Sequence, residues 1–308
     1  MTTLNASLLL QAAAAAAGDQ QYPTGTLYVV ATPIGNRADL TLRALHVLAL
    51  VDAIACEDTR HSAPLLRLLG IDKPLLPLHQ HNEREGAALV LRRLEAGERV
   101  AYVSDAGTPA VSDPGAALVA AVREAGLRAI PIPGPSSALA ALSVAGDTAA
   151  TAFTFLGFLP ARGAERTQAL AEVAASRGTA VLFEAPHRIA ALLRGLAEHC
   201  GPRTITVCRE LTKQFESVAT MRATELPGWI EADANRSRGE FVLVLHAQPL
   251  AAADASTPVH PAHDTALRAL LAVLPLKQAV ALTAEVTGAP RNALYERALE
   301  LKSGEAGE

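Results

Sequence analysis

Short apolar runs alternate with longer segments of helical spacing along the first half of the chain. Residues 27–30, 53–56 and 100–103 are continuous apolar runs, as is typical of strands buried on both faces of a sheet. Residues 42–48 and 86–96 carry apolar side chains at helical spacing. The alternation predicts parallel β-α-β units with helices on both faces of the sheet, and hence an α/β fold.

A second alternating block begins near Ala150. Its predicted strands are 153–156, 180–183, 204–208 and 240–245, and its predicted helices are 165–175 and 189–199. Glycine and short polar residues interrupt the apolar pattern at 145–148. We therefore predict two α/β domains, at 25–147 and at 148–246.

Both ends of the chain fall outside these blocks. Residues 1–24 contain an alanine run, but no Lys or Arg precedes Arg37, whereas a secretory signal begins with basic residues. We predict a helical or disordered extension at 1–24. Residues 247–263 are rich in Ala and Pro and predict a linker.

The last segment, 264–308, has helical spacing that is broken at Pro275 and at 288–290. Its later part has the spacing of a helix-turn-helix, a motif that docks nucleic acid. A small helical bundle without a nucleic-acid role is the alternative for this segment.

The composition suits a protein with large cores and no membrane span. Half of the 308 residues are hydrophobic, yet no apolar run approaches the roughly 18 residues that cross a bilayer. Cys56, Cys200 and Cys208 lack C-x-x-C spacing, which argues against a disulfide framework or a zinc site and favours a reducing cytoplasm. The net charge of −4 is unlike that of a basic nucleic-acid module, so RNA binding would need a local cationic patch.

Three loops that follow predicted strands carry the candidate chemistry. Residues 31–36, 104–115 and 133–137 are rich in Gly, Pro, Ser and Asp. The carboxyl ends of parallel strands share one edge of a sheet, where open α/β folds bind ligands. Ser104 and Asp105 offer polar side chains to such a ligand. The chain has neither the G-x-G-x-x-G nor the P-loop pattern, so the sequence supports no dinucleotide fingerprint and no P-loop.

Six motifs give the chain a resemblance to the tetrapyrrole methylase superfamily, from about residue 25 to residue 245. They read ATPIGN at 31–36, EDTRH at 57–61, SDAGTP at 104–109, PGPSS at 133–137, FEAPHR at 183–188 and RELTK at 209–213. The last two are similar to the branch that modifies ribosomal RNA. The resemblance implies a class III methyltransferase of two α/β domains with a cleft between them, using S-adenosylmethionine.

The same resemblance implies a reaction and partners. The reaction would be 2′-O-methylation of a cytidine in the decoding region of 16S ribosomal RNA, within the small ribosomal subunit. The enzyme would be cytoplasmic and homodimeric.

The resemblance also implies which residues contact the methyl donor. They are Pro33, Ala106, Gly107, Thr108, Val111, Ser136, Ser137, Glu184 and Leu211. We add Ser104 and Asp105 of the second loop. Ser136 and Ser137 could equally cap the helix that follows them, since a hydroxyl can accept from free amides of a first helical turn.

A ribose 2′-hydroxyl is a poor nucleophile at neutral pH, so a base or a cation beside it would help. The catalytic candidates are Glu57, Arg60, Arg188, Glu210 and Lys213, with Asp58 and Glu184 as further carboxylates. Glu57 and Asp58 could instead cap a helix, and Glu210 could pair with Arg209. The cations available for RNA phosphates are Arg60, Arg162, Arg166, His187, Arg188, Arg209 and Lys213.

Two other functions are open to a chain with these motifs. A methyltransferase acting on a tetrapyrrole-like ring would need a large apolar acceptor trough, and the first loop, ATPIG, lacks the Gly-rich pattern usual in that group. A non-catalytic RNA-binding assembly factor would bind the donor without turnover. Deleting 265–301 should impair an RNA enzyme and hardly affect a ring methylase.

Overall fold

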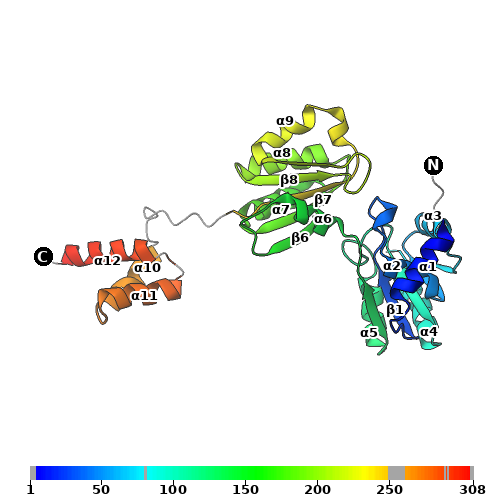
Figure 1. Cartoon of the computed structure of the whole chain (residues 1–308). Helices are drawn as coiled ribbons and strands as arrows, with labels where there is room; N and C mark the ends of the chain where they lie inside the picture. The colour runs from blue at the N-terminus through cyan, green and yellow to red at the C-terminus, as the bar shows by residue number, and fades with distance from the viewer. Residues whose placement is uncertain (1–4, 80–81, 249–260, 288, 290, 306–308) are drawn as a thin grey trace. The chain divides into compact units, whose positions relative to one another are not determined.

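The computed structural model describes residues 5–79, 82–248, 261–287, 289 and 291–305 (Figure 1). The chain divides into two compact units, the first ending at Ala247 and the second beginning at Gln248. The first unit contains two lobes, each built on a five-stranded sheet flanked by helices. The predicted α/β class is therefore confirmed.

The first lobe has the parallel sheet that the alternation of apolar runs predicted. Its strands are β1 (Thr26–Val30), β2 (Ala53–Cys56), β3 (Leu75–Pro77), β4 (Arg99–Val103) and β5 (Arg128–Ile132), in the spatial order β3-β2-β4-β1-β5. Every neighbouring pair is parallel. The helices are α1 (Ala6–Ala17), α2 (Leu42–Leu50), α3 (Thr59–Leu68), α4 (Glu83–Glu95) and α5 (Ala116–Glu124), with a 3-10 turn at Arg37–Asp39.

Both faces of this sheet are covered because successive strand residues point to opposite sides. Ile54 and Cys56 pack in one core with residues of α2 and α3. Ala53 and Ala55 pack in the other core with residues of α4 and α5. Helix α1, in the predicted N-terminal extension, adds the fully buried Ala13 to the first core.

The second lobe has a mixed sheet. Its strands are β6 (Phe153–Phe158), β7 (Thr179–Glu184), β8 (Thr204–Arg209), β9 (Ser217–Arg222) and β10 (Phe241–Leu245), in the order β6-β7-β10-β8-β9. Only β6 and β7 pair in parallel, and β10 lies antiparallel between β7 and β8. The expectation of parallel units thus fails here, because the last strand enters the gap that β7 and β8 leave open.

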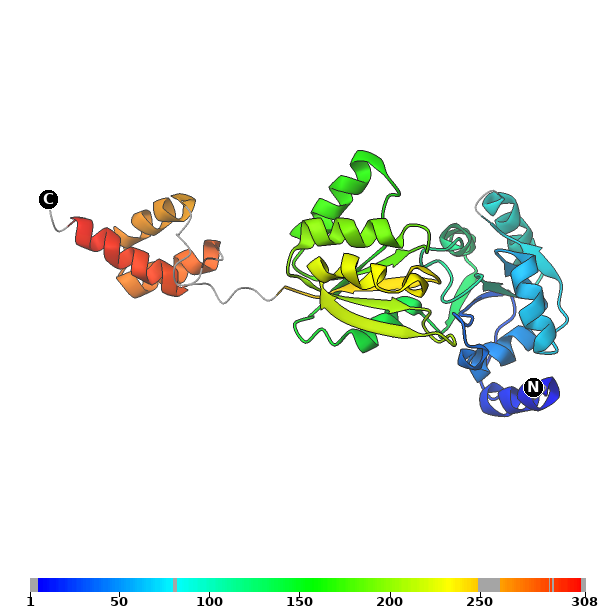
Figure 2. The same ribbon diagram turned by 90° about the horizontal axis from the view of Figure 1, so that it is seen from above.

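Helices cover both faces of this second sheet as well. Helix α6 (Ser137–Ala145) packs three buried alanines against one face. The other face carries α7 (Gly163–Ala175), α8 (Ile189–Cys200) and α9 (Leu226–Glu231). Figure 2 shows α7 and α8, in green, together on that side. Short 3-10 turns lie at Ala223–Glu225 and Ala234–Ser237.

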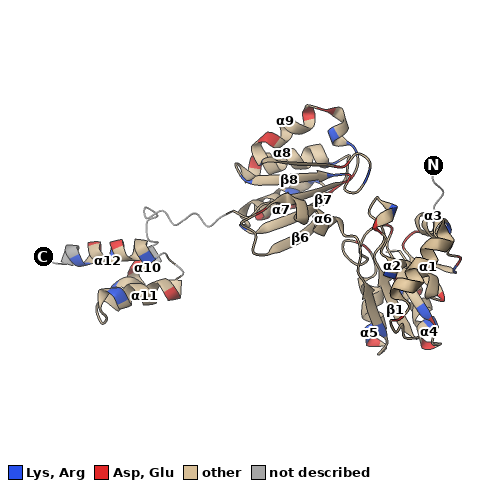
Figure 3. Ribbon diagram, in the orientation of Figure 1, with Lys and Arg blue, Asp and Glu red and all other residues tan. Residues whose placement is uncertain are grey.

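The second unit is a bundle of α10 (Pro261–Leu271), α11 (Leu276–Thr287) and α12 (Arg291–Glu305). Its core contains Leu267, Val280 and Leu294. Residues 249–260 of the predicted linker lie outside the described residues. Figure 3 shows acidic and basic residues intermixed on the helices of this unit. Among the described helices of the whole chain, none is long and apolar enough to cross a membrane.

Candidate functional site

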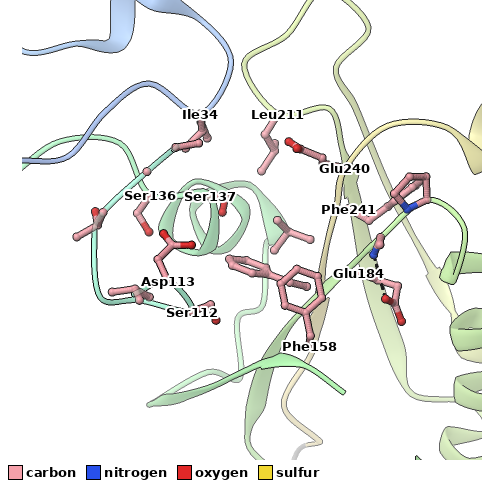
Figure 4. A pocket seen from close by; sticks show the side chains of 18 residues that line it. Ile34, Ser112, Asp113, Ser136, Ser137, Phe158, Glu184, Leu211, Glu240 and Phe241 are labelled. Carbon is pink, nitrogen blue, oxygen red and sulfur yellow. Dashed lines mark hydrogen bonds between the residues drawn. The ribbon is translucent and has the colours of Figure 1, made fainter. Parts of the chain in front are cut away.

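A cavity of about 340 Å³ opens in the first unit and is lined by both lobes (Figure 4). The first lobe contributes Ile34, Ala106, Gly107, Thr108, Val111, Ser112 and Asp113, followed by Ser136 and Ser137 at the start of α6. The second lobe contributes Phe158, Phe183, Glu184, Ala185, Pro186, Leu211, Glu240, Phe241 and Val242. The size is that of a small-molecule site.

The loop between β4 and α5 is held in one unusual conformation. Its backbone enters the left-handed region at Gly107 (φ 80°), Ala110 (65°), Ser112 (64°) and Gly115 (119°). A Cβ at Gly115 would lie 2.3 Å from a ring carbon of Tyr102, so only glycine fits there. The Tyr102 hydroxyl donates to the Pro114 carbonyl at 2.8 Å. Both contacts fix the loop against β4.

The three predicted loops meet at the cavity. The amide of Thr32 donates to the Gly107 carbonyl at 2.9 Å, and the Gly107 amide donates back to Thr32 at 3.0 Å. The Thr108 hydroxyl donates to the Pro135 carbonyl at 3.0 Å. A Cβ at Gly134 would lie 3.0 Å from that of Ala31. Residues from three separate strand ends therefore form one rigid wall, as their shared position at the sheet edge predicted.

The segment after β8 brings the second lobe against the first loop. Glu210 (φ 51°) and Thr212 (φ 67°) are both left-handed, which is costly for a β-branched residue. The Thr212 hydroxyl accepts from the Asn36 amide at 3.0 Å. The Lys213 ammonium bridges Glu210 and Glu240 at 3.0 and 2.8 Å. This conformation presents Leu211 to the cavity.

The Lys213 pairing also sets the charge of Glu210. Burial raises the pKa of the Glu210 carboxyl, but the hydrogen bonds from the Glu240 amide and from Lys213 outweigh burial and lower it. Glu210 is therefore an ionised partner of Lys213. The sequence left open that Glu210 forms an ion pair with Arg209. The structure shows Glu210 in an ion pair, but its partner is Lys213.

Glu184 faces the interior of the second lobe. The Glu184 side chain is 0% exposed. Arg188 Nε lies 2.9 Å from Glu184 Oε1, so the two side chains form an ion pair. The same oxygen accepts from the Ala185 amide at 2.9 Å. Arg166 Nη1 approaches Glu184 Oε2 at 3.9 Å. The guanidinium of Arg188 also donates to the Leu159 carbonyl. This cluster fixes Ala185 and Pro186, which line the cavity.

Eight of the eleven predicted donor contacts line the cavity. They are Ala106, Gly107, Thr108, Val111, Ser136, Ser137, Glu184 and Leu211. Ser136 also caps α6, because its hydroxyl accepts from the Leu139 amide. Pro33 precedes the lining residue Ile34, Ser104 is buried, and Asp105 pairs with His61 at 3.0 Å. Whether these side chains touch a donor stays a prediction.

None of the five catalytic candidates lines the cavity. Arg60 is exposed and pairs with Asp58 at 2.6 Å, while Asp58 caps α3 through the Arg60 amide. Burial, with nearby Asp105 and Asp113, raises the pKa of Glu57. Arg188, Glu210 and Lys213 are engaged in the ion pairs described above. Their catalytic roles stay predictions.

The cavity is also lined by residues that were not among the predicted donor contacts. They are Ile34, Ser112, Asp113, Phe158, Phe183, Ala185, Pro186, Glu240, Phe241 and Val242. Ser112 and Asp113 belong to the loop 104–115, whose polar composition could have marked them. Phe241 and Val242 reach the cavity only because β10 inserts beside β7, which the spacing did not reveal. Within the described residues, no group of His, Cys, Asp or Glu could hold a metal ion.

Comparison with known proteins identifies the class of this two-lobed fold. A family model described as "Tetrapyrrole (Corrin/Porphyrin) Methylases" matches residues 26–227, and one described as "RsmI C-terminal HTH domain" matches 257–302. Among solved structures, the uroporphyrin-III-C-methyltransferase of Thermus thermophilus has a TM-score of 0.52 at 24% identity, covering 72% of this chain and 94% of its own. The methyltransferase CobJ has a TM-score of 0.55 at 21% identity, covering 73% and 95%. The chain therefore belongs to the tetrapyrrole methylases and has their fold.

Curated relatives identify one family within this class of methylases. "Ribosomal RNA small subunit methyltransferase I" of Escherichia coli O157:H7 is 45% identical over 90% of this chain and 95% of its own length. Its namesake in Xylella fastidiosa is 48% identical over 88% and 98%. The chain belongs to the ribosomal RNA small subunit methyltransferase I family.

The cavity fits the S-adenosylmethionine that this family uses. Gly107 lines the cavity in a left-handed conformation (φ 80°) that glycine adopts without strain. Ile34, Val111 and Leu211 offer apolar contact for an adenosyl group. The hydroxyls of Ser136 and Ser137 add polar groups to that wall.

Proposed function

We propose that this protein transfers the methyl group of S-adenosylmethionine to the 2′-hydroxyl of a cytidine in the decoding region of 16S ribosomal RNA. The observation that carries the proposal is the similarity to relatives named "Ribosomal RNA small subunit methyltransferase I", at 42–48% identity over about 90% of the chain. That similarity spans the cavity and extends into the second unit, where the helix-turn-helix model matches.

The geometry is consistent with a reaction governed by positioning. S-adenosylmethionine supplies an electrophilic methyl group, so the protein has mainly to bind and orient both reactants. The wall formed by the three loops is rigid, as pre-organisation requires. The second lobe supplies the opposite wall, with Leu211 held by strained backbone on either side.

The direct test is methyl transfer from labelled S-adenosylmethionine to small ribosomal subunits that lack the modification. We expect nucleoside mass spectrometry to detect 2′-O-methylcytidine. A different methylated nucleoside would correct the site, and transfer to a tetrapyrrole-like ring would favour the ring-methylase alternative. Donor binding without any methylated product would favour the assembly factor.

We propose that the second unit docks the RNA substrate. The helix-turn-helix model matches residues 257–302, which include α10, α11 and most of α12, and Arg291 and Asn292 are exposed at the start of α12. A chain ending at Ala247 retains the first compact unit. We expect it to bind S-adenosylhomocysteine with unchanged affinity in calorimetry, but to methylate subunits at least about tenfold less efficiently, since tenfold corresponds to about 1.4 kcal/mol of lost docking. Full activity of the truncated chain would contradict the docking role.

We also propose that the protein is a homodimer in the cytoplasm. Several large apolar side chains of α6 and β6 are exposed: Leu139 (57%), Val144 (50%), Phe153 (49%) and Leu156 (40%). Exposed apolar surface of this kind marks interaction sites, and β6 is an edge strand that pairs with β7 on one side only among the described strands. Replacing Leu139 and Leu156 with lysine should shift the sedimenting species from dimer to monomer. A wild-type chain that sediments as a monomer would contradict the proposal.

The cytoplasmic assignment rests on the substrate and on the cysteines. Cys56, Cys200 and Cys208 are all free and buried, which suits a reducing compartment.

A further inference from the structure

Three carboxylates line the cavity, and they differ in their partners. Glu184 is labelled in Figure 4, where its carboxylate lies away from Asp113. It forms an ion pair with Arg188 and accepts from the Ala185 amide. Glu240 is paired with Lys213 at 2.8 Å. Asp113 makes no ion pair with any described residue, and its carboxylate points into the cavity beside Ser136 (Figure 4). Asp113 is thus the cavity carboxylate that is not already neutralised by a cation.

The backbone around Asp113 is fixed on both sides. Ser112, before it, is held at φ 64°, and Pro114, after it, accepts a hydrogen bond from Tyr102. The Gly115 amide donates to Glu83 Oε1 at 3.3 Å. Gly157 of β6 packs so close that a Cβ there would lie 2.8 Å from the Ser112 hydroxyl oxygen. The Asp113 carboxylate is therefore presented from a rigid loop, as a group that moves a proton requires.

The close contact at Gly157 brings an aromatic side chain to the same end of the cavity. Phe158 follows Gly157 and lines the cavity, yet 53% of it is exposed. Its ring packs edge-on against Phe183, with the centroids 5.7 Å apart. An aromatic ring held from one side and open on the other is a platform on which an unstacked base can lie.

We propose that the end of the cavity formed by Ser112, Asp113 and Phe158 is the acceptor subsite, which receives one ribonucleotide with its base against Phe158 and its 2′-hydroxyl at Asp113. This assignment rests on the proposed function. As the bond from the 2′-oxygen to the methyl carbon forms, the sulfur–methyl bond breaks and its electron pair stays on sulfur. The proton of the hydroxyl passes to the Asp113 carboxylate.

The surroundings of Asp113 favour this role. Burial raises the pKa of the Asp113 carboxyl, and the charge of Asp105 adds to the rise, while a hydrogen bond with Ser104 opposes it. A carboxylate with a raised pKa is a stronger base than an ordinary aspartate. Glu57, Glu83 and Tyr102 are titratable groups near Asp113, and Glu184 and Glu240 line the same cavity, each paired with a cation. The carboxylate must be ionised to accept the proton, so activity should fall as the pH drops through its raised pKa.

Asp113→Asn tests the proton transfer. We expect the single-turnover rate on unmodified small subunits to fall by a factor of about 10² or more, as loss of a general base does. Affinities for S-adenosylhomocysteine and for the subunits should stay within about twofold of wild type, since the amide keeps the shape of the carboxylate. Asp113→Glu should retain part of the activity, with a shifted acid limb of the pH–rate profile.

Phe158→Ala tests the stacking platform. We expect the affinity for subunits, measured by filter binding with S-adenosylhomocysteine present, to fall by about tenfold, in the range reported for loss of base stacking. Donor affinity should be unchanged, and Phe158→Tyr should restore subunit binding. Phe215→Ala is the matched control, because Phe215 is 67% exposed on the same lobe and does not line the cavity.

The outcomes separate this assignment from the proposed function. Equal methylation by wild type and Asp113→Asn would overturn the base assignment alone. Loss of S-adenosylhomocysteine affinity in Asp113→Asn would overturn it by placing Asp113 at the donor. Unchanged subunit affinity in Phe158→Ala would overturn the platform. Failure of the wild type to methylate subunits would overturn the proposed function, and this subsite with it.

Discussion

Arg188→Met will lower the free energy of unfolding by about 3–5 kcal/mol, the usual cost of removing one partner from a buried ion pair. The reason is the state of Glu184, whose side chain is completely buried and faces Arg188 at 2.9 Å. Arg166 is 3.9 Å away and offers only a weaker contact. The Leu159 carbonyl would also lose its donor. Denaturant unfolding, followed by circular dichroism, measures the difference.

A matched control lies on the same helix. Arg194 of α8 is 56% exposed and contacts Glu231 at 3.9 Å, so Arg194→Met should change stability by less than about 0.5 kcal/mol. The double variant Glu184→Gln with Arg188→Met should recover part of the lost stability, since the fully buried side chain at position 184 then carries no charge. A wild-type-like Arg188→Met protein that is stable but inactive would contradict this structural role and support the catalytic one predicted from sequence.

Gly107→Val will reduce the affinity for S-adenosylhomocysteine by about tenfold or more. A valine at φ 80° carries backbone strain of about 1–3 kcal/mol, and its relief would move the loop that lines the cavity. Its Cβ would also lie 3.4 Å from Ile34, a cavity residue, and the branch would enlarge that contact. Isothermal titration calorimetry measures the loss, which corresponds to about 1.4 kcal/mol or more.

Gly97→Val controls for backbone strain alone. Gly97 has φ 85°, it has nothing within 4 Å of a Cβ built on it, and it does not line the cavity. We expect this variant to lose a comparable amount of stability while binding the donor analogue as the wild type does. Equal loss of affinity in both variants would show that general destabilisation, and not the cavity wall, is responsible.

The sequence was sufficient to predict the first lobe because its strands are locally distinct. Residues 53–56, a continuous apolar run, form β2 with those bounds. The second lobe was harder to predict from the sequence, for two physical reasons. β9, Ser217–Arg222, alternates exposed and half-buried residues on an edge, so it carries a weak apolar signal. The antiparallel insertion of β10 depends on long-range pairing, which spacing along the chain does not report.

The difference between local sequence signals and long-range packing also explains which site residues could be predicted. Gly107 and Thr108 were recognisable because glycine and polar residues after a strand are a local signal. The side-chain directions of Glu184 and Arg188 were not, because Glu184 ends β7 and Arg188 precedes α8, and only the fold turns the two side chains toward each other inside the lobe. Phe158 was missed because it lies beyond the predicted strand 153–156, and its place at the cavity depends on long-range packing, such as the close approach of Gly157 to Ser112.

The position of β10 has a consequence for how the protein is made. The strand at Phe241–Leu245 is the middle strand of the second sheet and the last strand along the chain. A nascent chain on the ribosome can complete the first sheet once β5 is synthesised, since every strand of that sheet lies before Ile132. The second sheet is completed only when β10 is synthesised, more than a hundred residues after Ile132, and β7 and β8 stay unjoined from residue 209, where β8 ends, to residue 241. Such an open edge is a hazard for mispairing, so the second lobe is where a chaperone would be needed during translation.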